Sequence, residues 1–218
     1  MGSAPILLDM EAQADFFLPE GSCFSDKSLP AARNVYRLFE WARLNRIPVI
    51  STVLRVRPSE VGPLARVPHC REGSFGERKL ARTALPRRIN LGLLNSTDLP
   101  EDLLERYQQV IFEKRLPDIF AHSRLERLIT ELPPATFVIC GAGLVRGIAE
   151  SAIGLRLRGF GVVLAEDAVL DLDDELAEMA ALRMEAKGVI FAPTSKIVSP
   201  RVRRRAKGTF RLQHSCTK

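Results

Sequence analysis

The feature that most constrains the fold is a repeated alternation of short apolar runs with helical patterns. The segments between these runs carry apolar residues at the spacing of helices that are buried on one face. Strands that alternate with such helices form parallel sheets covered on both sides. The sequence therefore predicts an α/β protein, a three-layer α/β/α sandwich with a mainly parallel, six-stranded, Rossmann-like sheet. The six expected strands are residues 6–10, 48–54, 109–114, 136–141, 161–167 and 188–193.

The expected helices have recognisable ends. Serine, proline or aspartate stands at each expected start, where these residues cap or open a helix. Gly188 follows the last helix, where a glycine commonly ends one. The predicted helices are about residues 29–45, 101–107, 125–132 and 175–187.

The composition favours one domain with a basic tail. A chain of 218 residues with 46% hydrophobic content can bury a single large core. The net charge of +6 comes from the end of the chain, because residues 198–218 hold seven basic residues and no acid, and the rest has a net charge of −1. We therefore expect a domain over residues 1–197 and a tail over residues 198–218. Nucleic-acid binding is expected only if the tail provides it.

The chain has no apolar run near the eighteen residues of a membrane span. An acidic residue, Asp9, comes after the first eight residues, where a signal peptide would need a longer apolar region. We expect a soluble, cytoplasmic protein that does not bind membranes. The four cysteines are scattered without a CxxC spacing, so neither a zinc site nor a redox pair is expected. No cofactor is expected.

Three further patterns indicate where a site would lie. Residues 137–152, FVICGAGLVRGIAESA, run from an apolar strand through a glycine turn into a helix, an arrangement that presents groups at the carboxyl edge of a sheet. Asp9 and Lys114 each close an expected strand at that edge, where they could share proton-transfer work or form an ordinary ion pair. The irregular residues 55–96 are expected to cover the same edge as a substrate loop.

Several segments resemble the isochorismatase-like hydrolases, a superfamily that includes nicotinamidases, N-carbamoyl amidohydrolases and isochorismatases. ILLDMEAQADFF resembles the DMQxDF opening of that family, with two additional residues between Asp9 and Asp15. The other matching segments are IPVISTV, PHCREGSFG, FEKRLPDIFAHSRLERLI, the glycine turn and its helix, and GVIFAPTSKIV. The resemblance covers about residues 4–197 and implies the isochorismatase-like fold.

The resemblance implies roles for three residues. Asp9 matches the catalytic aspartate and Lys114 the catalytic lysine, while Gly147 stands where most members have the nucleophilic cysteine. Ser151 and Cys140 are too far along the chain to replace that cysteine. Metal-binding members carry an aspartate and a histidine after the second strand, where this chain has Val53, Leu54 and Arg55, so no catalytic metal is expected.

Two functions are compatible with a glycine at this position. Isochorismatases also have one and hydrolyse a vinyl ether without a covalent intermediate, which would make Asp9 the general acid or base and Lys114 its electrostatic partner. However, the aromatic residue and the histidine that isochorismatases have at positions 143 and 145 are absent, and PHCREGSFG resembles the amidohydrolase branch. The alternative is a catalytically inactive protein of the same fold that binds a small molecule or serves as an assembly module.

The substrate side of the site is expected to include both apolar and basic groups, with Arg71 and Arg146 as candidates for binding a carboxylate. His122 is expected to be a capping or surface residue rather than a base. The family commonly forms dimers or larger assemblies, so a homo-oligomer is expected. The predicted substrate-binding residues are Phe16, His69, Arg71, Ala142, Gly143, Leu144 and Arg146.

Overall fold

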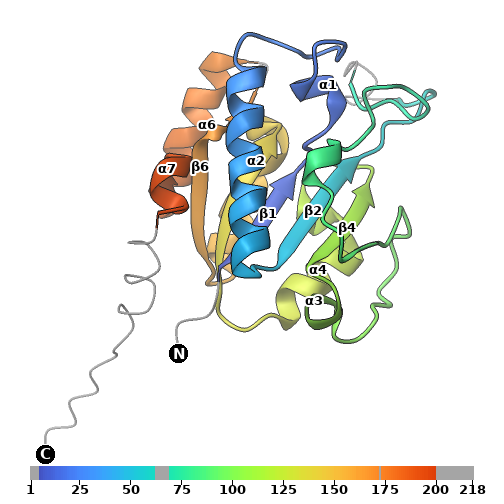
Figure 1. Cartoon of the computed structure of the whole chain (residues 1–218), viewed down its shortest axis with the longest axis vertical. Coiled ribbons are helices and arrows are strands. Elements are labelled where there is room, and N and C mark those ends of the chain that lie inside the picture. The colour runs from blue at the N-terminus through green and yellow to red at the C-terminus, as the bar shows by residue number, and fades with distance from the viewer. Residues whose placement is uncertain (1–4, 62–68, 172, 200–218) are drawn as a thin grey trace, which may run out of the picture.

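The computed structural model describes residues 5–61, 69–171 and 173–199. Its centre is one sheet of seven strands in the order β3-β4-β2-β1-β5-β6-β7, and all neighbouring strands are parallel (Figure 1). This confirms the predicted α/β class and the Rossmann-like parallel sheet. The strands are β1 (Ile6–Met10), β2 (Val49–Leu54), β3 (Arg88–Asn90), β4 (Gln109–Lys114), β5 (Thr136–Ala142), β6 (Gly161–Leu170) and β7 (Ile190–Ala192).

The predicted helices are present, with changes in length, and two short helices, Ala14–Phe17 and Thr194–Ile197, were not predicted. The predicted helix over residues 101–107 is shorter in the structure, and the last long helix begins after Asp173, whose side chain accepts a hydrogen bond from the Leu176 amide. The helices are α1 (Ala14–Phe17), α2 (Ser28–Asn45), α3 (Leu103–Arg106), α4 (Ser123–Glu131), α5 (Ala149–Leu157), α6 (Asp174–Ala186) and α7 (Thr194–Ile197).

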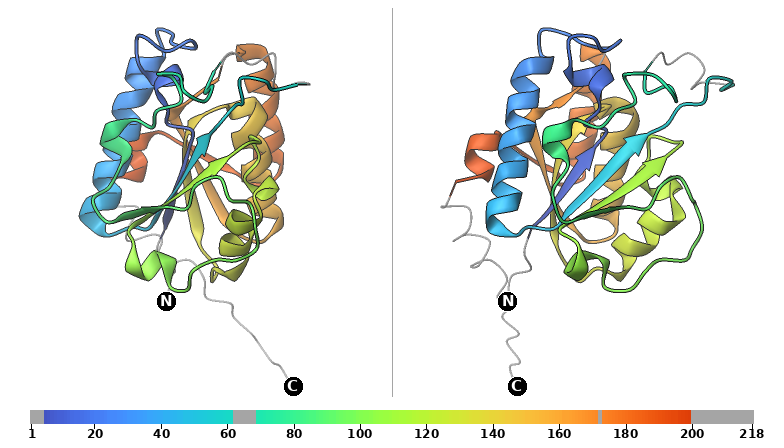
Figure 2. Two further views of the ribbon diagram at one scale, coloured as in Figure 1. Left: turned by 90° about the vertical axis from the view of Figure 1, so that its right-hand side faces the viewer. Right: turned by 45° about the vertical axis from the view of Figure 1, so that its right-hand side comes forward.

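The helices cover both faces of the sheet (Figure 2). One core lies between the sheet and α2, with α7 beside it. The other lies between the sheet and α3, α4, α5 and α6. Because side chains alternate along a strand, Leu7 of β1 belongs to the α2 core, while Leu8 and Met10 belong to the opposite core. This alternation decides which charged groups at the strand ends can meet.

The prediction of six strands is wrong by one. The seventh strand, β3, lies inside the segment that was expected to be irregular and pairs with β4 at one edge of the sheet. It has only three residues, and the two outer ones are exposed. A strand this short and this exposed leaves no apolar run in the sequence.

The predicted basic tail lies almost entirely outside the described residues, which end at Ser199. Within those residues, no helix is both long enough and apolar enough to span a membrane.

Candidate active site

Asp9 closes β1 as predicted, but its side chain lies on the α2 side of the sheet. Its Oδ2 atom forms an ion pair with Lys79 Nζ, and the Lys79 ammonium lies 5.5 Å from the centre of the Phe39 ring on α2. The Asp9 side chain is fully buried and that of Lys79 is 12% exposed. The other carboxylate oxygen, Oδ1, is buried and has no hydrogen-bond partner among the residues that the structure describes.

Lys114 closes β4 and points to the opposite side of the sheet. Its ammonium donates to Glu11 Oε1 at 2.5 Å, to the Leu116 carbonyl at 3.0 Å and to the Pro117 carbonyl at 2.5 Å. The side chains of Lys114 and Glu11 are 2% and 3% exposed. All three N–H groups of the ammonium therefore have acceptors inside the protein.

The predicted meeting of Asp9 with Lys114 is wrong. Val110 and Phe112 lie on the same face of β4 as Lys114, and they pack in the core on the α4 side. Asp9, in contrast, faces α2. The two side chains leave the sheet on opposite faces because of the two-residue period of a strand. Glu11 is the carboxylate that Lys114 binds instead.

Glu11 reaches Lys114 because the chain changes direction at the end of β1. Its φ of +57° is in the left-handed region, where a residue other than glycine costs of order 1–3 kcal/mol unless its surroundings fix it. The Glu11 amide donates to the Thr52 carbonyl at 3.1 Å, and the Glu11 carbonyl accepts from the Gln13 amide at 2.7 Å. These bonds hold the turn that breaks the strand alternation.

The sequence contained a signal for Glu11. Gln13, Asp15 and Phe16 reproduce the QxDF part of the family opening, and counting back two residues from Gln13 reaches Glu11 rather than Asp9. Read in this way, the additional residues of the chain lie before the site carboxylate.

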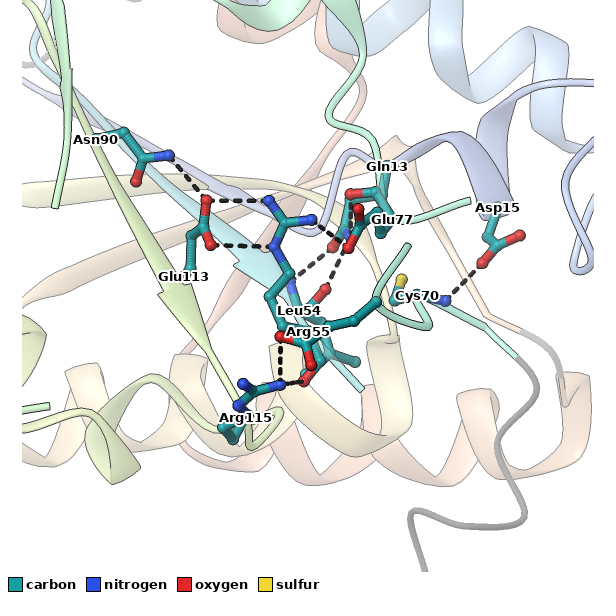
Figure 3. Close-up of polar contacts among 10 residues, drawn as sticks. Gln13, Asp15, Leu54, Arg55, Cys70, Glu77, Asn90, Glu113 and Arg115 are labelled. Atoms are coloured by element: carbon teal, nitrogen blue, oxygen red, sulfur yellow. Dashed lines mark hydrogen bonds and ion pairs between the residues drawn. The ribbon is translucent and has the colours of Figure 1, made fainter. Parts of the chain in front are cut away.

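The other residues of this motif fix the neighbouring loop. The side-chain Nε2 of Gln13 donates to the backbone carbonyls of Leu54 and Glu77, both at 2.9 Å. The side-chain Oε1 of Gln13 accepts from the backbone amide of Leu54 at 2.7 Å. Asp15 accepts from the Cys70 amide at 2.5 Å (Figure 3). Both side chains are buried, so the loop residues Cys70 and Glu77 are tied to α1 and to the end of β2.

The glycine turn lies beside this pair. Gly141 has a φ of +127°, and a Cβ there would lie 1.7 Å from the Met10 carbonyl oxygen, so only glycine fits. A Cβ on Gly143, whose φ is +80°, would lie 3.5 Å from Glu11 Oε2. The chain then forms one π-helical turn, Leu144–Ile148, before α5 begins.

Gly147 is buried within that turn. A Cβ at this position would lie 3.1 Å from the Pro117 carbonyl oxygen and 3.4 Å from Pro117 Cβ. The same carbonyl accepts a hydrogen bond from Lys114. The structure thus gathers Glu11, Lys114 and Gly147 around the turn at Pro117.

Two predicted substrate-binding residues, Phe16 and His69, lie together. Their ring centres are 4.6 Å apart, and both side chains are buried. The pKa of His69 is lowered to about 4, chiefly by burial; the charge of Asp15 opposes this shift, and the charge of Arg146 adds to it. Arg71 and Arg146 are exposed, Gly143 and Leu144 are half-buried, and Ala142 is buried.

Acidification should destabilise the fold through His69. Its pKa is about 4 in the folded state and about 6.5 without the fold, so the unfolded chain binds a proton in this interval that the folded chain does not. The stabilisation by neutral His69 is complete above about pH 6.5, is lost as the pH falls to about 4, and amounts to on the order of 3 kcal/mol. Urea unfolding at pH 7 and pH 4.5 measures it. A His69→Leu variant should lose less stability, and an equal loss in both proteins would contradict the prediction.

His122 is buried and caps α4, as expected for a capping residue. Its Nδ1 atom accepts from the Leu125 amide at 3.4 Å, and its ring meets the Phe112 ring edge-on. Burial lowers the pKa of His122, which keeps the ring neutral and able to accept this bond. Cys140 is also buried, and burial raises the pKa of its thiol well above the usual range, with a further contribution from Asp9.

A group of charged side chains lies at the ends of β2 and β4 (Figure 3). Arg55 forms a two-pronged ion pair with Glu113, with both N–O distances at 3.0 Å, and a second ion pair with Glu77 at 2.5 Å. Asn90 of β3 also donates to Glu113. The sequence analysis noted Arg55 only as a residue that stands where metal-binding relatives carry metal ligands.

The chain is similar to known proteins in two comparisons, one with family models and one with solved structures. A family model described as the isochorismatase domain matches residues 93–195. No curated protein matches the chain. Several solved structures share its fold at identities below 20%.

Three of these solved structures are amidases. A nicotinamidase/pyrazinamidase from Bacillus subtilis has a TM-score of 0.68 and 18% identity, over 87% of this chain and 100% of its own. A pyrazinamidase from Pyrococcus horikoshii in complex with zinc has a TM-score of 0.65 and 19% identity, over 88% and 99%. An N-carbamoylsarcosine amidase from Thermoplasma acidophilum has a TM-score of 0.64 and 15% identity, over 88% and 97%. At these identities, the likeness shows the fold.

Proposed function

Since this protein belongs to the isochorismatase-like superfamily, in its fold and in its domain match over residues 93–195, we propose that it is a hydrolase of a small molecule that works without a covalent intermediate. Glu11, in place of Asp9, is the general acid or base, and Lys114 is its electrostatic partner. The observation that supports this most is the buried Glu11–Lys114 ion pair beside Gly143 and Gly147. Small-molecule substrates follow from the amidases that share the fold.

The absence of a thiol at position 147 sets the type of chemistry. Cys70 and Cys140 are buried, and burial raises the pKa of both thiols, so neither supplies a thiolate. With a vinyl ether, Glu11 in its acid form gives a proton to the enol carbon. Water then attacks the oxocarbenium ion, and the proton it releases returns to Glu11. The resulting hemiketal or hemiacetal breaks its bond to the ether oxygen, and its hydroxyl proton passes to that oxygen, which releases a carbonyl compound and an alcohol. Lys114 stabilises the Glu11 carboxylate that exists between the two proton transfers.

The residues at the end of β2 and just after it do not fit a metal ion. Val53 and Leu54 are buried apolar side chains without a donor atom for a metal, and Arg55 brings a positive charge that is already paired with Glu77 and Glu113. A cation would meet repulsion there. The proposed reaction therefore has no metal-dependent step.

A hydrolysis screen tests the proposal. The wild-type protein is assayed against vinyl ethers, amides and carbamoyl compounds beside Glu11→Gln, with Glu40→Gln, an exposed carboxylate on α2, as the matched control. We expect turnover of one class, a loss of at least about a hundredfold in Glu11→Gln and none in Glu40→Gln. Turnover that survives in Glu11→Gln would contradict the assigned role.

The second candidate is a non-catalytic module that binds a small molecule, and one observation favours it. The Lys114 ammonium has all three donors occupied, two of them by the Leu116–Pro117 turn, which also lies against Gly147. A substrate would have to displace that turn. Ligand binding detected by thermal shift, with no turnover of any class, would favour the module over the hydrolase. A homo-oligomer remains our prediction for either function.

A further inference from the structure

Arg55 is the residue after β2, and its side chain joins three separate segments. Its guanidinium binds Glu113 on β4 through two parallel hydrogen bonds and Glu77 on the loop between β2 and β3 through a third contact. The Arg55 and Glu77 side chains are each 21% exposed, and that of Glu113 is 15% exposed. The contacts are thus largely shielded from solvent, where charge-assisted pairs are stronger than at the surface.

The backbone of Arg55 adds two contacts to the same strand end. Its amide donates to the Lys114 carbonyl at 2.9 Å. Its carbonyl accepts from the Arg115 guanidinium at 3.1 Å (Figure 3). Arg115 also pairs with Glu72, further along the loop. Arg55 therefore contacts residues 113, 114 and 115 in succession.

The charges show that this cluster favours its ionised form. Burial alone would lower the pKa of Arg55, but the hydrogen bonds and charges of Glu113 and Glu77 outweigh burial and raise it. In the same way, burial would raise the pKa of Glu113, but hydrogen bonds from Arg55 and Asn90 lower it. The cluster is held together as a set of ion pairs.

Lys114 depends on this strand end for its position. It is the last residue of β4, and its side chain must leave the sheet opposite to that of Glu113 to reach Glu11. Beyond it, the chain turns at once through Leu116 and Pro117, whose carbonyls the ammonium binds. Asn90 also binds Glu113 and Glu72 also binds Arg115, but Arg55 is the residue that contacts both neighbours of Lys114.

We propose that Arg55 is a positioning residue for Lys114: by binding Glu113, Glu77 and the backbone on both sides, it sets the ammonium at the carboxylate of Glu11. This inference rests on the proposed function in one respect, that Lys114 is the partner of Glu11 in the reaction. It assigns to Arg55 a task where metal-binding relatives are expected to carry metal ligands.

The experiment measures the protection of the Lys114 amine rather than activity. The full-length protein is treated with an acetylating reagent, and the acetylation of each lysine is followed by mass spectrometry in wild type, Arg55→Met, Arg55→Lys and Arg43→Met. Arg43 is the matched control, because it pairs with Glu40 on the exposed face of α2. Hydrogen exchange of the β5 amides measures global unfolding in each protein.

We expect Lys114, which is 2% exposed in the structure, to resist acetylation in wild type and in Arg43→Met. In Arg55→Met, the acetylation of Lys114 should rise by about tenfold or more while the β5 amides stay protected. The reason is that the end of β4 around Lys114 can then open without unfolding of the whole protein. Arg55→Lys should lie between the two, since an ammonium cannot make the two-pronged contact. Protection of Lys114 equal to wild type in Arg55→Met, or acetylation that rises only in step with β5 exchange, would overturn the inference.

The outcomes also separate this inference from the proposed function. Loss of Lys114 protection in Arg55→Met, together with no hydrolysis by wild type, would keep the positioning role and reject the hydrolase. Hydrolysis by wild type, with full turnover and full Lys114 protection in Arg55→Met, would reject the positioning role alone.

Discussion

Replacing Lys114 with methionine should lower the free energy of unfolding by about 3–5 kcal/mol, because it leaves the Glu11 carboxylate buried without its charged partner. Glu11 is 3% exposed and has no other side-chain cation among its described contacts. Methionine has a similar length and apolar stem, so the cost reports on the charge more than on packing. Urea unfolding at pH 7 measures the change.

A double-mutant cycle shows whether the loss belongs to this pair. Glu11→Gln combined with Lys114→Met should recover much of the stability lost in Lys114→Met, with an interaction energy of about 2–3 kcal/mol. The pair Asp9 and Lys114 is the control, and its two substitutions should be additive within about 0.5 kcal/mol. Strong coupling between Asp9 and Lys114, with none between Glu11 and Lys114, would mean that the pairing described above is incorrect.

Replacing Lys79 with methionine should have an effect of similar size on the other face of the sheet, about 3–5 kcal/mol. Asp9 is fully buried, and its Oδ1 atom already lacks a hydrogen-bond partner within the described part of the chain. Without Lys79, both carboxylate oxygens would be unpartnered in the core beneath α2, and the Asp9 charge would have to be neutralised or the segment would open.

The double variant again provides the decisive comparison. Asp9→Val with Lys79→Met replaces the ion pair by apolar groups, and it should be close to wild type in stability or above it. A double variant that is as unstable as the sum of the single ones would show that the two residues do not act as a pair. Arg43→Met, which breaks an exposed pair on α2, is the control and should change stability by less than about 1 kcal/mol.

The fold could be predicted from the sequence because its strongest signals are local. Each of the six apolar runs forms a strand of the sheet, and most helices begin and end near their capping residues. β3 could not be predicted, because three residues at an exposed edge bury too little apolar surface to leave a pattern. The glycine turn could be predicted for the same local reason, because its glycines directly follow an apolar strand. The structure adds that Gly141 has no room for a Cβ.

The candidate site was predicted only in part. Lys114, Gly143 and Gly147 lie where the order of elements had placed them, close to the carboxyl edge of the sheet. The carboxylate that pairs with Lys114 was predicted wrongly, because Asp9 and Glu11 are two residues apart and both stand near the end of the same strand. The role of Arg55 was missed because its partners come from β4 and from a loop more than twenty residues away.

The sequence by itself determined the α/β class, six of the seven strands, and the residues available at the strand ends. These features could be predicted because the hydrophobic period and the turn residues act over a few neighbouring positions. Only the tertiary structure decided which charges pair. Asp9 and Lys114 leave the sheet on opposite faces, while the left-handed backbone at Glu11 turns its carboxylate toward Lys114. Such pairing depends on the direction of each side chain and on the cost of burying a charge alone, and both are properties of the folded chain.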